Sequence, residues 1–195
     1  MEKLKIALTG GIGTGKTYIS RMFLRMGFPV YYADTEAKNL YSRPEVINEI
    51  RSLFGESVFV GRKLDMKRMG SLIFTNDENR NRVNRVIHPL VMREFLSWTM
   101  QQKSKVIILE SAIIYEENLE SFFDLVMVVD ASLGTRIARI KSRNPDYDEE
   151  RIQSIIFAQM PQEEKCERAD IVIRNEEELK QTLSYKVNIK RPEKS

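Results

Sequence analysis

The sequence has very few of the residues from which disulfides and zinc sites are built. Among its 195 residues are one cysteine, Cys166, and one histidine, His88, so neither an intramolecular disulfide nor a Cys/His zinc set is available. The chain also lacks an apolar run as long as a membrane span, and its first residues enter an apolar strand pattern without a signal-peptide region. We therefore expect a cytoplasmic protein that is not inserted into a membrane.

An excess of charge of one sign is also missing. The 31 basic and 28 acidic residues give a formal net charge of +3, so we expect no broad electrostatic field and no nucleic acid partner. Hydrophobic residues make up 42% of the chain, which is enough for a sizeable interior at this length. We expect one compact domain, or a core with insertions.

The sequence does contain a glycine-rich segment, residues 10–17, which we call the phosphate loop. It matches G-x-x-x-x-G-K-[ST] and lies between an apolar run and a helical pattern, the setting that this motif requires. Glycines allow positive φ and bring amide groups close to an anion, while Lys16 would reach the β- and γ-phosphates and Thr17 would ligate Mg²⁺. A chance glycine-rich turn is the alternative. The expected nucleotide contacts are Gly11, Ile12, Gly13, Thr14, Gly15, Lys16, Thr17 and Tyr18.

Short apolar segments alternate with helical patterns along the rest of the chain. We expect strands at residues 3–9, 28–33, 105–109, 125–129 and 171–173, and helices at 15–26, 132–142, 149–158 and 176 to about 185. This alternation predicts an α/β fold, a three-layer α/β/α P-loop kinase with a five-stranded parallel sheet. Ligands of such sheets bind at the carboxyl ends of the strands.

Between the second and third strands the pattern is helical for much longer than a crossover requires. We expect a loop at residues 55–64, a short helix at 65–74, and a long helical stretch at 76–102 that breaks at His88-Pro89. The expected domains are a nucleotide-binding core (1–34, 104–135 and 169–190), a helical substrate-binding insertion (35–103) and a short helical lid (136–168). The lid is expected because a charged, proline-containing turn joins its two helices.

Three acidic residues end strands at the expected site. Asp34 is the candidate for orienting or deprotonating the nucleophile, because its strand is expected to neighbour the first strand; an N-cap at Asp34 or Thr35 is the alternative. Glu110 is placed like a Walker-B acid that holds the metal, or it is a capping carboxylate. Asp130 is more typical of a cap than of a catalyst.

Basic residues cluster on the first lid helix at Arg136, Arg139, Lys141 and Arg143. Arg139 and Arg143 share one helical face and are candidate cations for the transferring phosphate, although a solvated surface stripe fits the same spacing. His88 is either a general base or a structural histidine at the proline break, with the structural role favoured. Cys166 has no catalytic partner in the sequence and is interpreted as structural.

With these residues identified, the chain resembles the dephospho-coenzyme A kinase family over residues 4 to about 183. The resemblance is carried by an ordered set of short motifs that is more specific than the phosphate loop alone. These are residues 7–17, Ala33-Asp34, Leu64-Asp65 with Ile73-Phe74, Ile87-His88-Pro89, residues 113–116, the Arg139 and Arg143 pair, Gln159, Glu164-Lys165, Ala169-Asp170 and Asn175.

The resemblance implies transfer of the ATP γ-phosphate to the ribose 3′-hydroxyl of dephospho-coenzyme A, the last step of coenzyme A synthesis. It implies that Asp34 activates that hydroxyl and that ATP and Mg²⁺ bind at the phosphate loop. It also places Thr9 and His88 on the substrate side, Arg139 and Arg143 over the phosphates, and Asn175 near the adenine.

Several positions depart from the family pattern. The family often has Asp at Glu110, Pro at Ala112, and Arg at Met66 and Ile155; Arg151, one helical turn before Ile155, is a candidate replacement for the last charge. Three other functions fit the phosphate loop: another small-molecule or nucleoside monophosphate kinase, a nucleotide-binding switch, and a non-catalytic ATP-binding module. No Asn-Lys-x-Asp guanine-reading motif occurs in the chain, which argues against the switch.

Overall fold

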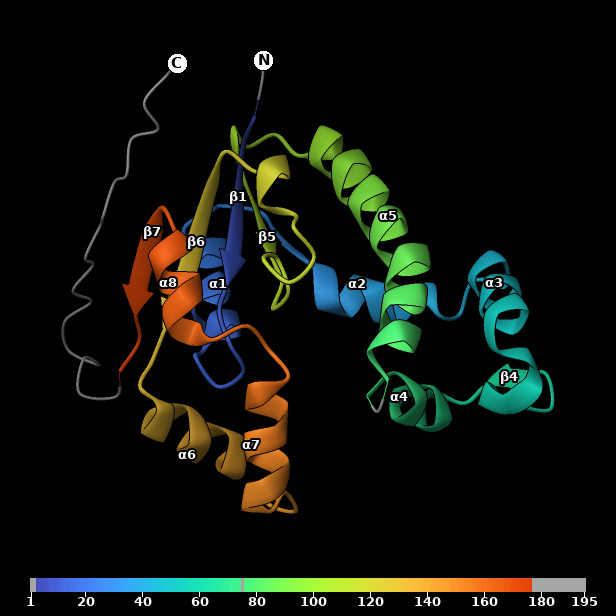
Figure 1. Ribbon diagram of the computed structural model, residues 1–195. Helices are drawn as coiled ribbons and strands as arrows, with labels where there is room; N and C mark the ends of the chain where they lie inside the picture. The colour runs from blue at the N-terminus through green and yellow to red at the C-terminus, as the bar shows by residue number, and fades with distance from the viewer. Residues whose placement is uncertain (1–2, 75, 177–195) are drawn as a thin grey trace. The chain divides into compact units, whose positions relative to one another are not determined.

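The computed structural model describes residues 3–74 and 76–176, and the chain forms two compact units. The first unit runs from the N-terminus to Tyr32 and resumes at Gln102, and the second unit is Ala33–Gln101. Figure 1 labels the elements of both units. Among the described helices, none is long and apolar enough to cross a membrane.

The first unit is built on a parallel sheet with the strand order β2-β5-β1-β6-β7. The strands are β1 (Leu4–Thr9), β2 (Val30–Tyr32), β5 (Val106–Glu110), β6 (Leu125–Asp130) and β7 (Ile171–Arg174). Figure 1 shows the arrowheads of β1, β6 and β7 at the same edge of the sheet. The predicted five-stranded parallel sheet is therefore confirmed.

The expectation that the second strand neighbours the first is wrong. β5 lies between them, with Ile108 opposite both Ile6 of β1 and Val30 of β2. Strands that follow one another in the sequence are usually, but not always, neighbours in a sheet. Here the whole second unit lies between β2 and β5 in the sequence. The carboxyl end of β2 still aligns with that of β5, because Tyr32 pairs with Glu110.

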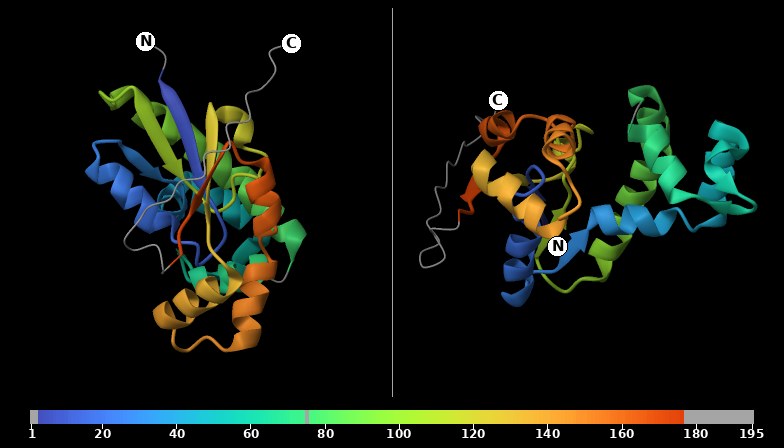
Figure 2. Two further views of the ribbon diagram at one scale, coloured as in Figure 1. Left: turned by 90° about the vertical axis from the view of Figure 1, so that its left-hand side faces the viewer. Right: turned by 90° about the horizontal axis from the view of Figure 1, so that it is seen from below.

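Helices cover both faces of this sheet. Helix α1 (Lys16–Arg25) lies on one face and α8 (Gln162–Arg168) on the other, as the left view of Figure 2 shows. The core between the layers contains Ile6, Leu8, Ile19, Val30, Ile108, Val129 and Ile173. The strands read as near-continuous apolar runs because both of their faces are buried, which is why the sequence predicted this layer arrangement.

The second unit is mainly helical. It contains α2 (Ala33–Leu40), α3 (Pro44–Phe54), the 3₁₀ helix η1 (Gly55–Val58), α4 (Met66–Phe74) and α5 (Asp77–Gln101). The predicted loop at 55–64 also holds an antiparallel hairpin of β3 (Phe59–Val60) and β4 (Lys63–Leu64). Its strands have two residues each, which is too short for a period-two pattern to be recognised in the sequence.

Helix α5 does not break at Pro89, so the predicted interruption is wrong. The helix is continuous from Asp77 to Gln101 with Pro89 inside it. Proline removes one amide donor, but Ile87, Val91 and Phe95 are all buried along one face of the helix. Packing of that face stabilises the helix across the proline. His88 therefore does not cap a helix break.

The helix caps also differ from two expectations. Helix α2 begins at Ala33, so Asp34 and Thr35 lie inside its first turn and are not N-caps. Asp130 does not cap α6 (Leu133–Arg143), because the Ser132 side chain does so by accepting from the Thr135 amide at 3.3 Å. Asp148 caps α7 (Glu149–Phe157) in the same way. The predicted helix at 176–185 lies outside the described residues beyond Glu176.

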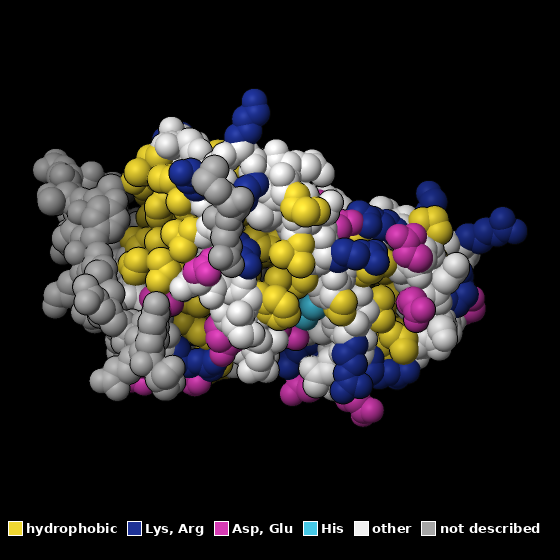
Figure 3. Space-filling model, turned by 90° about the horizontal axis from the view of Figure 1, so that it is seen from above, with side chains coloured by type: hydrophobic (Ala, Val, Ile, Leu, Met, Phe, Trp, Pro, Cys, Tyr) yellow, Lys and Arg dark blue, Asp and Glu magenta, His cyan; other side chains and the backbone are white. Residues whose placement is uncertain are grey.

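Charges of both signs occur on one face of the protein (Figure 3). On the face drawn in Figure 3, basic and acidic side chains are interspersed, so neither sign dominates that face. This agrees with the formal net charge of +3.

Candidate active site

The phosphate loop connects β1 to α1 through glycines with positive φ. Gly13 has φ 82° and Gly15 has φ 92°, and a Cβ added to Gly13 would lie 2.6 Å from the Arg136 carbonyl oxygen. Gly15 is the N-cap of α1 and has no side chain to occupy the first helical amides. The first turn of a helix has amides that point out of its N-terminus, so the loop and the helix start form an anion-binding arrangement.

The first part of the loop does not face this anion site. The Gly11 amide donates to Gln162 Oε1 at 2.9 Å, and the Ile12 amide donates to Gln159 Oε1 at 2.7 Å. The Thr14 hydroxyl is buried and donates to the Gly11 carbonyl at 2.9 Å. At the other end of the loop, the Tyr18 amide donates to the Gly15 carbonyl at 3.0 Å. The residues between Gly13 and Thr17 are therefore the part of the loop that is best placed for phosphate.

Thr17 and Glu110, the two predicted metal ligands, lie together in the structure. Thr17 Oγ1 donates to Glu110 Oε1 at 3.1 Å, and Ser20 Oγ donates to Glu110 Oε2 at 2.9 Å. Glu110 is only 7% exposed and does not cap a helix, so its alternative interpretation as a cap is wrong. Ser20 was missed in the sequence, although its position three residues after Thr17 places it on the same face of α1.

Lys16 lies over the phosphate loop. Its Nζ donates to the Gly10 carbonyl at 2.8 Å and more weakly to the Gly11 carbonyl at 3.4 Å. These carbonyls hold a cation beside the start of α1, where a phosphate would also be attracted.

Two of the predicted lid cations contact the phosphate loop. Arg139 Nη1 donates to the carbonyls of Gly13 (3.3 Å) and Thr14 (3.2 Å), and Arg136 Nε donates to the Ile12 carbonyl at 3.0 Å. Burial lowers the pKa of the Arg136 guanidinium, which nonetheless stays charged at neutral pH. Arg143, at the end of α6, is exposed, as is Lys141. The structure therefore brings Arg139, but not Arg143, to the loop.

Asn175 also lies against the loop. Its Nδ2 donates to the Thr14 carbonyl at 2.8 Å, and its own carbonyl accepts from Arg139 Nη2 at 2.9 Å. The Asn175 amide donates to the Asp130 carbonyl at 2.8 Å, which ties the end of β7 to the end of β6. The residues predicted for the lid and the adenine thus form one network around Gly15.

The remaining predicted residues are placed as follows. Thr9, at the end of β1, is fully buried, and its hydroxyl has no hydrogen-bond partner within the described part of the chain. Asp34 is exposed in the first turn of α2, and His88 is half-buried in α5; both belong to the second unit.

A buried ion pair holds α8 beside the site. Lys165 is 0% exposed, and its Nζ donates to Glu116 Oε1 at 2.7 Å and to the Ala112 carbonyl at 2.9 Å. Glu116 Oε1 also accepts from the Met160 amide at 3.1 Å. The loop after β5 is therefore bound to α8 and to Met160, which lies in the connection between α7 and α8.

We expect Lys165→Met to lower the free energy of unfolding by about 3 kcal/mol, because it leaves the Glu116 carboxylate and the Ala112 carbonyl without their buried partner. Urea denaturation followed by circular dichroism measures this change. Lys141→Met, on the exposed side of α6, is the matched control and should stay within about 0.5 kcal/mol of wild type. Equal stabilities of the two variants would contradict the structural role of Lys165.

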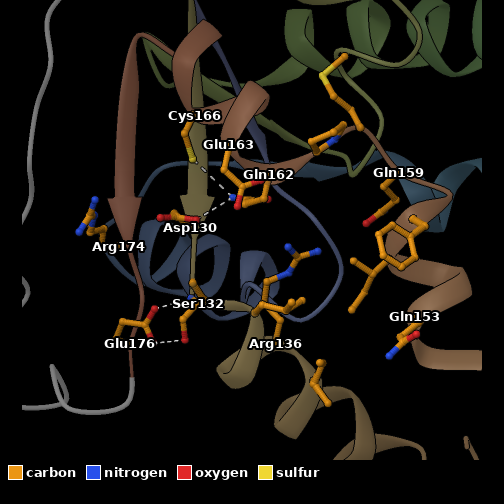
Figure 4. A pocket seen from close by; sticks show the side chains of 17 residues that line it. Asp130, Ser132, Arg136, Gln153, Gln159, Gln162, Glu163, Cys166, Arg174 and Glu176 are labelled. Carbon is orange, nitrogen blue, oxygen red and sulfur yellow. Dashed lines mark hydrogen bonds between the residues drawn. The ribbon is translucent and has the colours of Figure 1, made fainter. Parts of the chain in front are cut away.

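A cavity of about 800 Å³ lies between α6, α7, α8 and the ends of β6 and β7. Figure 4 shows Gln162 pointing toward Asp130 and Cys166 on one side of it, with Arg136 across from them. Burial raises the pKa of the Cys166 thiol to about 11, so the thiol is protonated at neutral pH and is a poor nucleophile. No phosphate-loop residue lines the cavity, whereas Arg136, Gln159 and Gln162 both line it and bind the loop.

The family model and the sequence relatives that match this chain carry the same description. The sequence model of the family described as dephospho-CoA kinase matches residues 4–181. A dephospho-CoA kinase of Bacteroides fragilis is 38% identical over 177 residues, which are 90% of this chain and 86% of the relative. One of Bacillus cereus is 35% identical over 182 residues, covering 91% of this chain and 90% of the relative.

A solved structure is also similar over most of the chain. The crystal structure of TT1252 from Thermus thermophilus matches with a TM-score of 0.83 and 30% identity, covering 92% of each chain. Family model, relatives and structure each cover most of the chain, and the residues matched by the family model include the phosphate loop, the second unit and α6 to β7. The chain therefore belongs to the dephospho-CoA kinase family.

Proposed function

We propose that this protein transfers the γ-phosphate of ATP to the ribose 3′-hydroxyl of dephospho-coenzyme A and so forms coenzyme A. The observation that carries this proposal is the phosphate loop with Thr17 bound to Glu110 and Arg139 bound to Gly13 and Thr14, in a chain of this family. Phosphoryl transfer depends mainly on positioning and on stabilising negative charge, and this group of residues supplies both.

The phosphate loop is the donor half of the proposed site. The amides at the start of α1 bind the phosphates, and Lys16 exchanges its loop carbonyls for β- and γ-phosphate oxygens when ATP binds. Arg139 adds a second cation next to Gly13 and Thr14. Asn175, in contact with Thr14 and Arg139, is proposed to lie near the adenine.

Thr17 and Glu110 have the chemistry of magnesium ligands. A hydroxyl and a carboxylate are hard oxygen donors, and both lie where the phosphates of ATP would bind. Mg²⁺, when bound, neutralises charge on the β- and γ-phosphates. Ser20 orients Glu110 by donating to its second oxygen.

The acceptor half of the site is proposed from the second unit and the lid. Residues 35–103 form the helical insertion that binds dephospho-coenzyme A, with Thr9 and His88 on the substrate side. Asp34 accepts the proton of the attacking 3′-hydroxyl. Residues 136–168 form the lid over the nucleotide-binding core (1–34, 104–135 and 169–190), and Arg143 joins Arg139 at the phosphates when the lid closes.

The deciding experiment is phosphate transfer from ATP to dephospho-coenzyme A in the presence of Mg²⁺, with coenzyme A identified by mass spectrometry. Turnover that Lys16→Ala abolishes would support the proposal. A panel of nucleoside monophosphates and metabolite alcohols tests the other kinase functions. Turnover of one of them, with none of dephospho-coenzyme A, would contradict the proposed acceptor. ATP hydrolysis that needs no acceptor would instead favour a nucleotide switch.

We expect Glu110→Gln to raise the Mg²⁺ concentration needed for half-maximal turnover about tenfold, because a neutral amide is a weaker ligand for a hard cation than a carboxylate. Titration of Mg²⁺ at saturating ATP measures the shift. Glu117→Gln, in the loop after β5, is the matched control and should leave the titration unchanged. A Glu110→Gln enzyme with a wild-type Mg²⁺ requirement would remove Glu110 from the metal site.

A further inference from the structure

The first half of the phosphate loop is held by Gln159, in the connection between α7 and α8, and by Gln162, the first residue of α8. Gln162 Oε1 accepts from the Gly11 amide and Gln159 Oε1 accepts from the Ile12 amide, at 2.9 and 2.7 Å. On the other side of the chain, Arg136 Nε donates to the Ile12 carbonyl at 3.0 Å. Three consecutive peptide groups of the loop are thus fixed from outside the loop.

We propose that Gln159 and Gln162 are positioning residues for ATP binding: they hold the Gly11 and Ile12 amides away from the phosphates and so fix the shape of the later half of the loop. The inference rests on the proposed function insofar as the ligand is ATP. It goes beyond that function by assigning a role to two residues that do not touch the phosphates themselves.

The loop needs such support because its own sequence does not fix its conformation. Gly10, Gly13 and Gly15 all have positive φ, and glycine loses more conformational freedom on folding than any other residue. Amides that turn away from the phosphates also need acceptors, since a buried donor without a partner is destabilising. The two glutamines supply these acceptors.

The residue type fits the position beside a triphosphate. A side-chain amide accepts a hydrogen bond through its oxygen but adds no net charge. A carboxylate at the same place would repel the phosphates of ATP. Glutamine can therefore hold these amides without adding a negative charge that would weaken the anion site.

Each glutamine is fixed by a different part of the fold. Gln162 is 6% exposed, and its Nε2 donates to the Val129 carbonyl (3.0 Å) and Asp130 Oδ1 (3.1 Å) at the end of β6. These bonds set the orientation of its amide, and Figure 4 shows the one to Asp130. Gln162 therefore connects the loop to the sheet.

Gln159 connects the loop to the proposed lid. It follows Ala158, the C-cap of α7, and precedes Met160, whose amide is held by Glu116 at 3.1 Å. One end of this short connection is thus anchored, while the other continues into α7. A movement of α7 reaches the Ile12 amide through Gln159, so the shape of the loop depends on the position of the lid.

Gln159→Met tests the proposal most directly, because methionine has a similar length and no amide acceptor. We expect the Kd for ATP, measured by calorimetry without any acceptor, to rise about tenfold, which corresponds to about 1.4 kcal/mol. Gln162→Met should raise it at least as much. Gln153→Met, the same substitution on the exposed face of α7, is the control and should keep the Kd within about twofold.

Steady-state kinetics separate positioning from a general loss of structure. For Gln159→Met we expect the KM for ATP to rise, with the kcat at saturating ATP and the KM for the acceptor close to wild type. An unchanged Kd for ATP in a folded Gln159→Met variant would overturn the proposal. Equal losses in both KM values, with a lowered melting temperature, would overturn it as well. Because the Kd is measured with ATP alone, it stays informative even if dephospho-coenzyme A is not the acceptor.

Discussion

Lys16→Ala is expected to lower kcat/KM about a thousandfold while the protein keeps its fold. In phosphoryl transfer the negative charge on the γ-phosphate oxygens spreads as the bond to the leaving group breaks. Loss of one fixed donor at such a site typically costs a factor of 10² to 10³. Lys16 also carries a full charge and lies at the start of α1, where the helix dipole already favours an anion.

The Lys16 side chain has a second role, in supporting the loop, which experiments can separate from its effect on the chemical step. It donates to the Gly10 and Gly11 carbonyls, so its removal also loosens the start of the loop. Pre-steady-state kinetics at saturating ATP report the chemical step, and calorimetry reports ATP binding. Lys105→Ala, an exposed lysine before β5, is the matched control with wild-type kinetics expected. A Lys16→Ala enzyme that retained a tenth of wild-type turnover would contradict the assigned role.

The phosphate loop was largely predictable because its signals are local. The motif formed by Gly10, Gly15, Lys16 and Thr17 spans only eight residues. It therefore predicts both the loop and the start of the helix that follows it. Glu110 is distant in sequence, but it ends an apolar strand, and parallel strands bring their carboxyl ends to one edge. The contact between Thr17 and Glu110 follows from the pairing of β1 with β5.

Other features depend on contacts that leave no pattern in the sequence. The order β2-β5-β1 is set by pairing between strands separated by the whole second unit. The continuity of α5 through Pro89 depends on the packing of its buried face. Gln162 is uncharged and belongs to no periodic or motif pattern, so only the fold shows that it binds Gly11. Sequence patterns show chemistry and local geometry, whereas these features come from tertiary packing.

Asp34→Asn is expected to lower kcat about a thousandfold and to leave the Kd for ATP within about twofold. Asparagine keeps the size of aspartate and one acceptor oxygen but cannot take the proton of the acceptor hydroxyl, and general-base catalysis contributes about 10² to 10⁴ in rate. Asp34 follows β2 by two residues, and β2 ends opposite Glu110 through the Tyr32 pair. Its exposed carboxylate is accessible to an incoming hydroxyl.

The comparison of kcat with ATP binding is what identifies a base. A residue that only stabilised α2 would, when changed, affect melting temperature and substrate binding together, whereas a base affects the chemical step alone. Glu36→Gln, in the same helix, tests this distinction, because it neutralises the carboxylate that accepts from Asn39 at 3.1 Å and leaves Asp34 intact. We expect wild-type kcat for Glu36→Gln. Wild-type kcat in Asp34→Asn would remove Asp34 from the mechanism, because the acceptor hydroxyl would then lose its proton without it.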